Sequence, residues 1–166
     1  ENFVCKVCGK KHKVLYRMEL PLPKILAEMS KEEKEKRVRS KDGFYLIDNN
    51  YFLTKCKLII TIKACEKNLE WLVWASMSKD DFLKNVNSES NTIKNTNFSY
   101  EGKLESEIPF YQKSFGSRVK IRHDFDDLDI IPKVEINEEG SKLREDQLNG
   151  LTINNVMNLM VQIYHP

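Results

Sequence analysis

Residues 51–62, with the sequence YFLTKCKLIITI, carry the pattern that decides the fold. Apolar and polar side chains alternate through this stretch, as they do in a β-strand that buries one face. The predicted core face is made of Phe52, Thr54, Cys56, Leu58, Ile60 and Ile62. The predicted solvent face carries Lys55, Lys57, Thr61 and Lys63. We therefore expect a long strand with Cys56 directed into the core.

The segments on either side of this strand predict its neighbours. Residues 44–46 and 51–53 flank Asp48-Asn49-Asn50, a turn sequence that favours a β-hairpin. Downstream, residues 69–77 are apolar on both faces, which is typical of a central strand. Trp71 and Trp74 lie on opposite faces of that strand. One belongs in the core, and Trp74 is the candidate for an exposed anchor that binds a partner.

The remaining elements follow from caps and periodicity. Ser30 and Glu33 form a capping-box pattern for a charged helix that ends near Arg37. Further strands are predicted at residues 98–104, 117–122 and 133–136. With Thr152 as N-cap, the C-terminal segment has an apolar stripe at helical spacing. The stripe consists of Ile153, Val156, Met157, Met160, Val161 and Tyr164.

Together these elements predict an α+β fold with a compact N-terminal knuckle, a mostly antiparallel sheet and a C-terminal amphipathic helix packed on the sheet. We expect a single domain over residues 1–166. Within it, residues 1–13 form the knuckle, 14–140 the helix-and-sheet core, and 141–166 the C-terminal helical segment.

Composition limits the function. The chain has 27 basic and 25 acidic side chains, a net charge of +2, so its overall charge attracts phosphate backbones weakly. No apolar run approaches the roughly 20 residues that span a bilayer, and residues 1–11 show no secretory signal pattern. We expect a cytoplasmic protein with reduced cysteines.

The motif with clear chemistry is Cys5-Lys-Val-Cys8-Gly9-Lys-Lys-His12. A two-residue gap lets both thiolates face one ion, Gly9 permits the tight turn, and His12 adds a nitrogen ligand. We predict a structural zinc ion, which needs four ligands. A redox pair is disfavoured because no βαβ pattern follows.

The fourth ligand is not local in sequence. The candidates are His165, His123, Cys56 and Cys65. We favour His165 because it ends the predicted helix that packs near the sheet. Without a fourth protein ligand, water would complete the shell and a catalytic metal would become the alternative.

Motifs along nearly the whole chain accompany the knuckle. They are Leu46-Ile47-Asp48, Trp71-Leu-Val-Trp74-Ala-Ser76-Met-Ser78 with Phe82, Pro109-Phe-Tyr111, Pro132-Lys-Val-Glu-Ile136, and Glu145-Asp-Gln147-Leu-Asn-Gly150-Leu151 with His165. With these motifs the sequence resembles the bacterial family called domain of unknown function 2199. The resemblance implies the fold and the knuckle, and no established activity. One departure from the family pattern is Tyr45. The resemblance implies a cysteine at this position, and that cysteine could bind zinc in relatives.

The residues favour binding over catalysis. Phosphate-binding glycine loops, nucleophile elbows and zinc-protease helices are all lacking in the sequence, so we expect no enzyme. The leading hypothesis is a non-catalytic protein-binding module. By analogy, its specific form is an immunity protein that neutralises a bacterial toxin. Candidate contact residues are Trp74 and the acidic Asp124, Asp126 and Asp127, which suit a basic target.

Two other classes stay open. A nucleic-acid-binding zinc knuckle is the alternative, because Lys6, Lys10, Lys11 and Lys13 surround the metal ligands. A metal-dependent hydrolase is third, and it requires an open coordination position.

Overall fold

A computed structural model describes residues 2–41, 43–83, 98–123 and 131–165. The strands are β1 (Asn2–Val4), β2 (Lys11–Lys13), β3 (Arg17–Glu19), β4 (Val38–Lys41), β5 (Phe44–Ile47), β6 (Tyr51–Thr61), β7 (Asn68–Met77), β8 (Phe98–Leu104), β9 (Arg118–His123) and β10 (Lys133–Ile136). The helices with assigned bounds are α1 (Lys24–Ala27), α2 (Lys31–Arg37), α4 (Lys142–Asn149) and α5 (Ile153–Tyr164). Within these described stretches, no helix has the length and apolar character that crossing a membrane requires.

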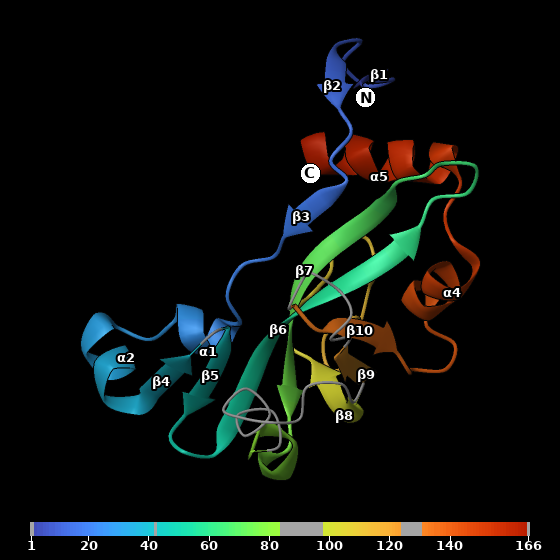
Figure 1. Ribbon diagram of the computed structural model, residues 1–166. Coiled ribbons are helices and arrows are strands. Elements are labelled where there is room, and N and C mark those ends of the chain that lie inside the picture. Colours follow the sequence, from blue (N-terminus) through green and yellow to red (C-terminus); the bar gives the residue numbers. More distant parts are fainter. Residues whose placement is uncertain (1, 42, 84–97, 124–130, 166) are drawn as a thin grey trace.

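The β6–β7 hairpin is the centre of the sheet (Figure 1). Its strands pair antiparallel from Phe52↔Met77 to Thr61↔Asn68. Along its length β6 pairs with β5 and then with β10, and β7 pairs with β8 and with β3. Because β8, β9 and β10 also pair in succession, strands β6 to β10 close into a ring. The prediction of a mostly antiparallel sheet is confirmed, with parallel pairing at β3–β7 and β10–β6.

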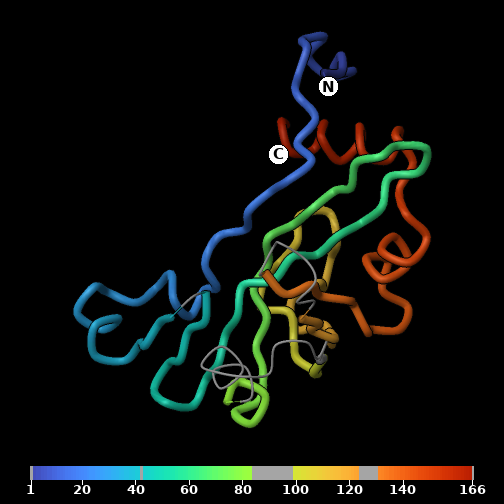
Figure 2. Tube along the Cα trace, viewed as in Figure 1, coloured from blue at the N-terminus to red at the C-terminus, as the bar shows by residue number. Residues whose placement is uncertain are grey.

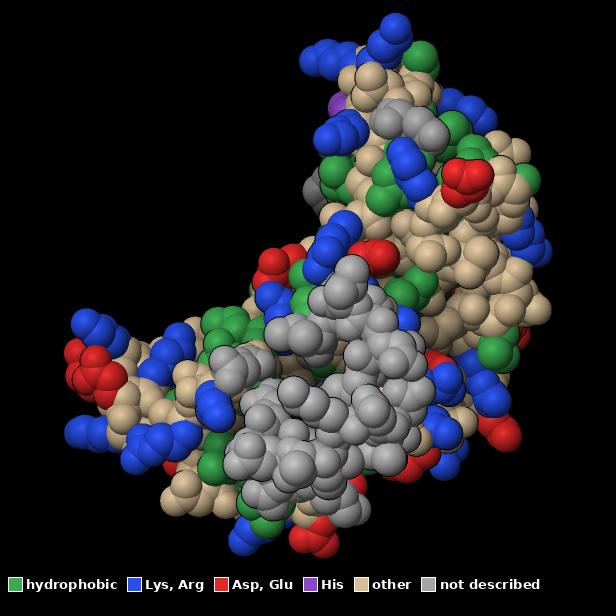
Figure 3. All heavy atoms as spheres, in the orientation of Figure 1, with side chains coloured by type: hydrophobic (Ala, Val, Ile, Leu, Met, Phe, Trp, Pro, Cys, Tyr) green, Lys and Arg blue, Asp and Glu red, His purple; other side chains and the backbone are tan. Residues whose placement is uncertain are grey.

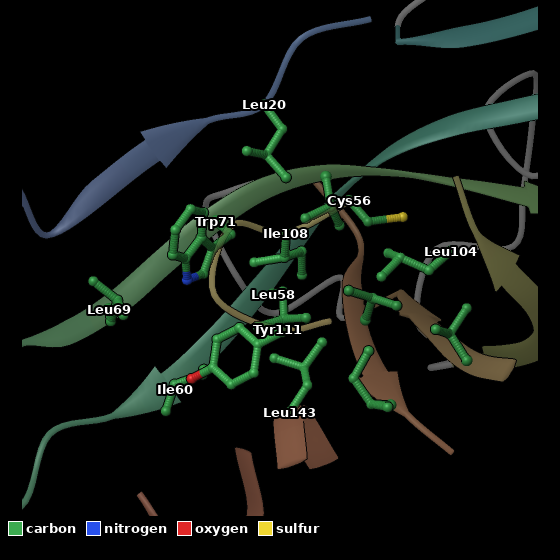
Figure 4. Packing of buried hydrophobic residues seen from close by; sticks show 14 of the residues in the cluster. Leu20, Cys56, Leu58, Ile60, Leu69, Trp71, Leu104, Ile108, Tyr111 and Leu143 are labelled. Carbon is green, nitrogen blue, oxygen red and sulfur yellow. The ribbon is translucent and has the colours of Figure 1, made fainter. Parts of the chain in front are cut away.

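The main core lies on the predicted face of β6. All six residues assigned to that face are buried. Figure 4 shows Cys56, Leu58 and Ile60 packed among residues of β7, α4 and the segment that contains Ile108 and Tyr111. Burial raises the pKa of the Cys56 thiol, so Cys56 stays neutral and packs as a small apolar side chain.

The face of the β6–β7 hairpin opposite the main core is partly buried, whereas the sequence predicted that this face of β6 is exposed to solvent. Leu53 and Trp74 are buried there with Leu26 and Ile47 in a second hydrophobic cluster. The cluster forms because Leu26 of α1 and Ile47 of β5 pack against this part of the hairpin, and Met29, Val38 and Tyr45 pack around them. Trp74 is only 4% exposed, so the expectation of an exposed Trp74 anchor is wrong.

Lys57 also departs from its predicted solvent exposure. It is 6% exposed, because β10 pairs beside it and α4 packs over β6. The long lysine stem can be covered in this way while its charged end reaches a polar environment.

The last two helices are held by side-chain contacts. Gln147 on α4 bonds the edge of β10: its Oε1 accepts from the Ile136 amide at 2.8 Å and its Nε2 donates to the Val134 carbonyl at 2.8 Å. Thr152 caps α5 by accepting from the Asn155 amide, as predicted.

The predicted packing of α5 on the sheet is confirmed in part. Its buried residues are Val156 and Met160, which join the main core. Figures 1 and 2 show the helix lying across the end of the β6–β7 hairpin, beside the chain that leads from β2 to β3. A hydrogen bond links this segment to α5: the Leu15 amide donates to the Met160 sulfur at 3.3 Å.

The close approach of strands at Gly102 gives a first prediction. A Cβ on Gly102 would lie 2.3 Å from the Ser76 carbonyl oxygen and 3.1 Å from Ile121 Cδ1. The Ser76 carbonyl is held in place by the pairing of β7 with β8, so we expect Gly102→Ala to lower the free energy of unfolding by about 1–3 kcal/mol. Urea denaturation measures this loss. The control Lys103→Ala, at the next and exposed position of β8, should change it by no more than about 0.5 kcal/mol.

Candidate metal centre

The knuckle is a short hairpin with a tight turn that presents its cysteines. Strands β1 and β2 pair antiparallel, with Phe3 opposite His12. Between them, the Cys5 amide donates to the Lys10 carbonyl and the Gly9 amide donates to the Cys5 carbonyl, both at 2.9 Å. Gly9 has a φ of 70°, a left-handed conformation that glycine adopts without strain. The turn thus needs the glycine that the sequence places there.

The structure brings Cys5, Cys8, His12 and His165 together. One ligand atom from each residue lies within 4.8 Å of all the others. Cys5 Sγ lies 3.2 Å from His165 Nε2, and Cys8 Sγ lies 3.1 Å from His12 Nε2. A sulfur and a nitrogen bound to the same tetrahedral zinc ion would be about 3.6 Å apart, given their usual bond lengths. The four side chains therefore need only small shifts to share one ion.

His165 reaches this group because α5 ends there. It is the C-cap residue of the helix, and its amide still donates to the Val161 carbonyl at 3.0 Å. The ligands come from both ends of the sequence, since Cys5 and His165 are 160 positions apart. Figure 1 shows the knuckle beside the C-terminal end of α5.

The two cysteines have different surroundings. Cys5 is 1% exposed, whereas Cys8 is exposed. Burial raises the pKa of Cys5, but hydrogen bonds with the backbone amides of Cys8 and Val7 and with the Cys8 side chain lower it, and together they bring the net pKa below its usual value. The Val7 amide approaches the Cys5 sulfur at 3.4 Å. The turn itself therefore favours the thiolate, the form that binds metal.

Aromatic rings pack against His12. The His12 ring stacks on Tyr164 with 4.3 Å between centroids, and Phe3 lies 5.9 Å from His12. The Tyr164 hydroxyl donates to the Lys13 carbonyl at 3.0 Å. Sequence reasoning assigned Tyr164 only to the apolar stripe of the helix. Its position next to His165 was the signal that it also supports the site.

The other candidate ligands lie elsewhere. His123 is on β9 and lies 3.0 Å from the Tyr100 hydroxyl, Cys56 is in the core, and the half-buried Cys65 accepts from the Lys67 amide at 3.5 Å. Tyr45 lies beside Trp74, with ring centroids 5.2 Å apart. The metal group has four candidate ligands without a residue from this position. The predicted contact residues Asp124, Asp126 and Asp127 are outside the described residues.

The donor set determines which ions fit. Two sulfurs and two imidazole nitrogens suit soft or borderline ions such as zinc, and they do not suit calcium or magnesium, which prefer oxygen. Over the described ranges, this is the group of three or more His, Cys, Asp or Glu side chains positioned to hold a metal. It can hold one ion with four protein ligands.

Comparison with known proteins identifies the family of the chain. No curated protein and no solved structure matches the chain significantly. A family model described as "Uncharacterized protein conserved in bacteria (DUF2199)" matches residues 4–151, which include three of the four ligands and end before α5. The chain therefore belongs to the bacterial family DUF2199.

Proposed function

We propose that this protein is a non-catalytic binding module in which one structural zinc ion joins the knuckle to helix α5. The observation that carries the proposal is the convergence of Cys5, Cys8 and His12 with His165 across 160 positions of sequence. In a chain that already has a large core, such a site would fix the position of two peripheral elements, the knuckle and α5.

The ligand count favours a structural role. Catalytic zinc sites usually have three protein ligands and one water, whereas structural sites have four protein ligands. All four positions here are supplied by side chains, and the group contains no carboxylate. A hydrolase would need an open position for water or substrate, which a Cys₂His₂ set does not leave.

Metal analysis of the purified protein tests the proposal. We expect one zinc ion per chain by elemental analysis and native mass spectrometry. Replacement with Co²⁺ should give the intense visible absorption of a tetrahedral site with thiolate ligands, because that geometry permits the d–d transitions. A metal-free protein that has the same unfolding midpoint with and without added zinc would contradict the proposal.

The binding role needs its own experiment. Since a closed zinc site leaves the metal no catalytic task, we place the function on the protein surface, with another protein as partner. Neutralisation of a toxin is the specific form that we propose by analogy. Native mass spectrometry of the protein isolated from its own host should show a stoichiometric protein partner, and an identified toxin would support the specific form. Turnover of a substrate by the zinc-loaded protein would contradict the non-catalytic role.

A further inference from the structure

The knuckle concentrates positive charge. Residues 2–13 contain Lys6, Lys10, Lys11 and Lys13 and no acidic residue. All four lysines are exposed, and within the described ranges none has an acidic oxygen within 4.0 Å. The remaining chain has 23 basic and 25 acidic side chains, so the excess of positive charge resides in the knuckle. Figure 3 shows Lys and Arg side chains gathered over this end of the molecule.

A bound zinc ion would not change this charge. Zn²⁺ with two thiolates and two neutral imidazoles has no net charge. The adjacent helix α5, INNVMNLMVQIY, contains no Lys, Arg, Asp or Glu. The zinc-binding end therefore keeps a charge of about +4 with no acidic side chain on either of its two elements, which creates a local positive potential.

Exposed apolar side chains lie among the lysines. Val4 is 61% exposed and Val7 is 67% exposed, and both belong to the knuckle. Val7 follows Lys6 directly and lies in the turn between the two metal-binding cysteines. An apolar contact bordered by charged groups is the usual composition of a protein–protein interface.

From this arrangement we infer that the knuckle is a docking surface for an acidic, partly aliphatic patch on a partner protein. Charge complementarity supplies the attraction, and the valines contact apolar side chains of the partner. The inference rests on the proposed function, because the zinc ion holds the turn that carries Val7. It adds the chemistry of the partner and the location of the contact.

The aromatic residues favour protein over nucleic acid. Proteins that bind single strands stack bases on exposed aromatic rings. At this end of the molecule Phe3 is 6% exposed, and His12 and Tyr164 are half-buried and stack on each other. Within the described part of this end, the most exposed apolar side chains are aliphatic, and aliphatic side chains do not form such stacks.

Fluorescence anisotropy with three defined probes tests the inference. The probes are a 20-residue peptide of glutamates with interspersed leucines, the same peptide with serine in place of leucine, and a 20-nucleotide oligo(dT). We expect the leucine peptide to bind most tightly. Lys6→Glu combined with Lys10→Glu should weaken that binding at least tenfold at low salt. Val7→Ser should weaken it about threefold while leaving the serine peptide unaffected.

Matched controls separate the knuckle from net charge. Lys31→Glu with Lys36→Glu on α2 makes the same change of charge at exposed positions and should alter binding less than twofold. Lys6→Gln with Lys10→Gln repeats the main test without placing acids beside the thiolates. Equal weakening by the α2 variant, or tighter binding of oligo(dT) than of both peptides, would overturn the inference. Zinc content is measured first in every variant, so failure of the metal site is distinguished from failure of the docking surface.

Discussion

Cys5→Ser is expected to release the zinc ion and to free the knuckle and α5 from their fixed positions. Loss of a direct ligand should weaken zinc binding by more than the 10–100-fold that is typical for residues around a zinc ligand. A ligand present at 1,000 times its Kd stabilises the native state by about 4 kcal/mol, and most of this contribution should disappear. Hydrogen exchange should accelerate most in β1, β2 and α5, while β6 and β7 keep most of their protection, because the amides of these two strands are held by the long ladder from Phe52↔Met77 to Thr61↔Asn68.

A matched control is available within the same chain. Cys65→Ser makes the same chemical change at a half-buried cysteine outside the metal group. It should retain one zinc ion and the protection of α5. If Cys5→Ser bound zinc as tightly as the unmodified protein, Cys5 would not be a ligand. If Cys65→Ser lost the metal as well, the loss in Cys5→Ser would not identify Cys5 as a ligand.

The elements of the fold were predictable where a local pattern determines them. The alternation from Phe52 to Ile62 identified β6 and its core face. The Ser30 and Glu33 capping box and the Thr152 cap identified the starts of α2 and α5. These signals depend on residues a few positions apart, so the sequence alone contains them.

Features that depend on distant segments were not predictable. The parallel pairing of β10 with β6 joins Lys133 to Lys57, and no local pattern specifies such a partner. The same reason explains the error at Trp74. Period-two alternation shows which residues share a face, but it does not show that residues of α1, β4 and β5 pack against that face.

In the metal group, too, a local pattern predicted three residues, whereas the fourth depended on the packing of a distant segment. Cys5, Cys8 and His12 lie within one turn and its flanking strand, so their spacing predicted them. The fourth position depended on where α5 packs. His165 was preferred over His123 because it ends an amphipathic helix, and the structure places its Nε2 3.2 Å from Cys5 Sγ. The family match ends at residue 151 and gives no information about this choice.

Trp74→Ala is expected to lower the free energy of unfolding by about 3–5 kcal/mol, the usual cost of removing a buried tryptophan. The ring is 4% exposed, packs edge-on against Tyr45, and has Lys55 Nζ 5.8 Å from its centroid. Its removal would leave a cavity beneath α1 and β5, because the strands on both sides are fixed by pairing. Chemical denaturation, with the slope checked for constancy, measures the loss.

Trp74→Phe distinguishes the contribution of packing from that of the indole nitrogen. Trp74 Nε1 is buried and has no hydrogen-bond partner among the described residues, so losing this N–H breaks no hydrogen bond with them. We therefore expect Trp74→Phe to cost about 1–2 kcal/mol, from lost volume alone. Phe115→Ala, at an aromatic ring that is 58% exposed, should cost less than about 1 kcal/mol. If Trp74→Ala were as mild as Phe115→Ala, the second cluster would not be a core in solution. The segment from α1 to β5 would then separate readily from the hairpin, and Trp74 would again be a candidate contact for a partner.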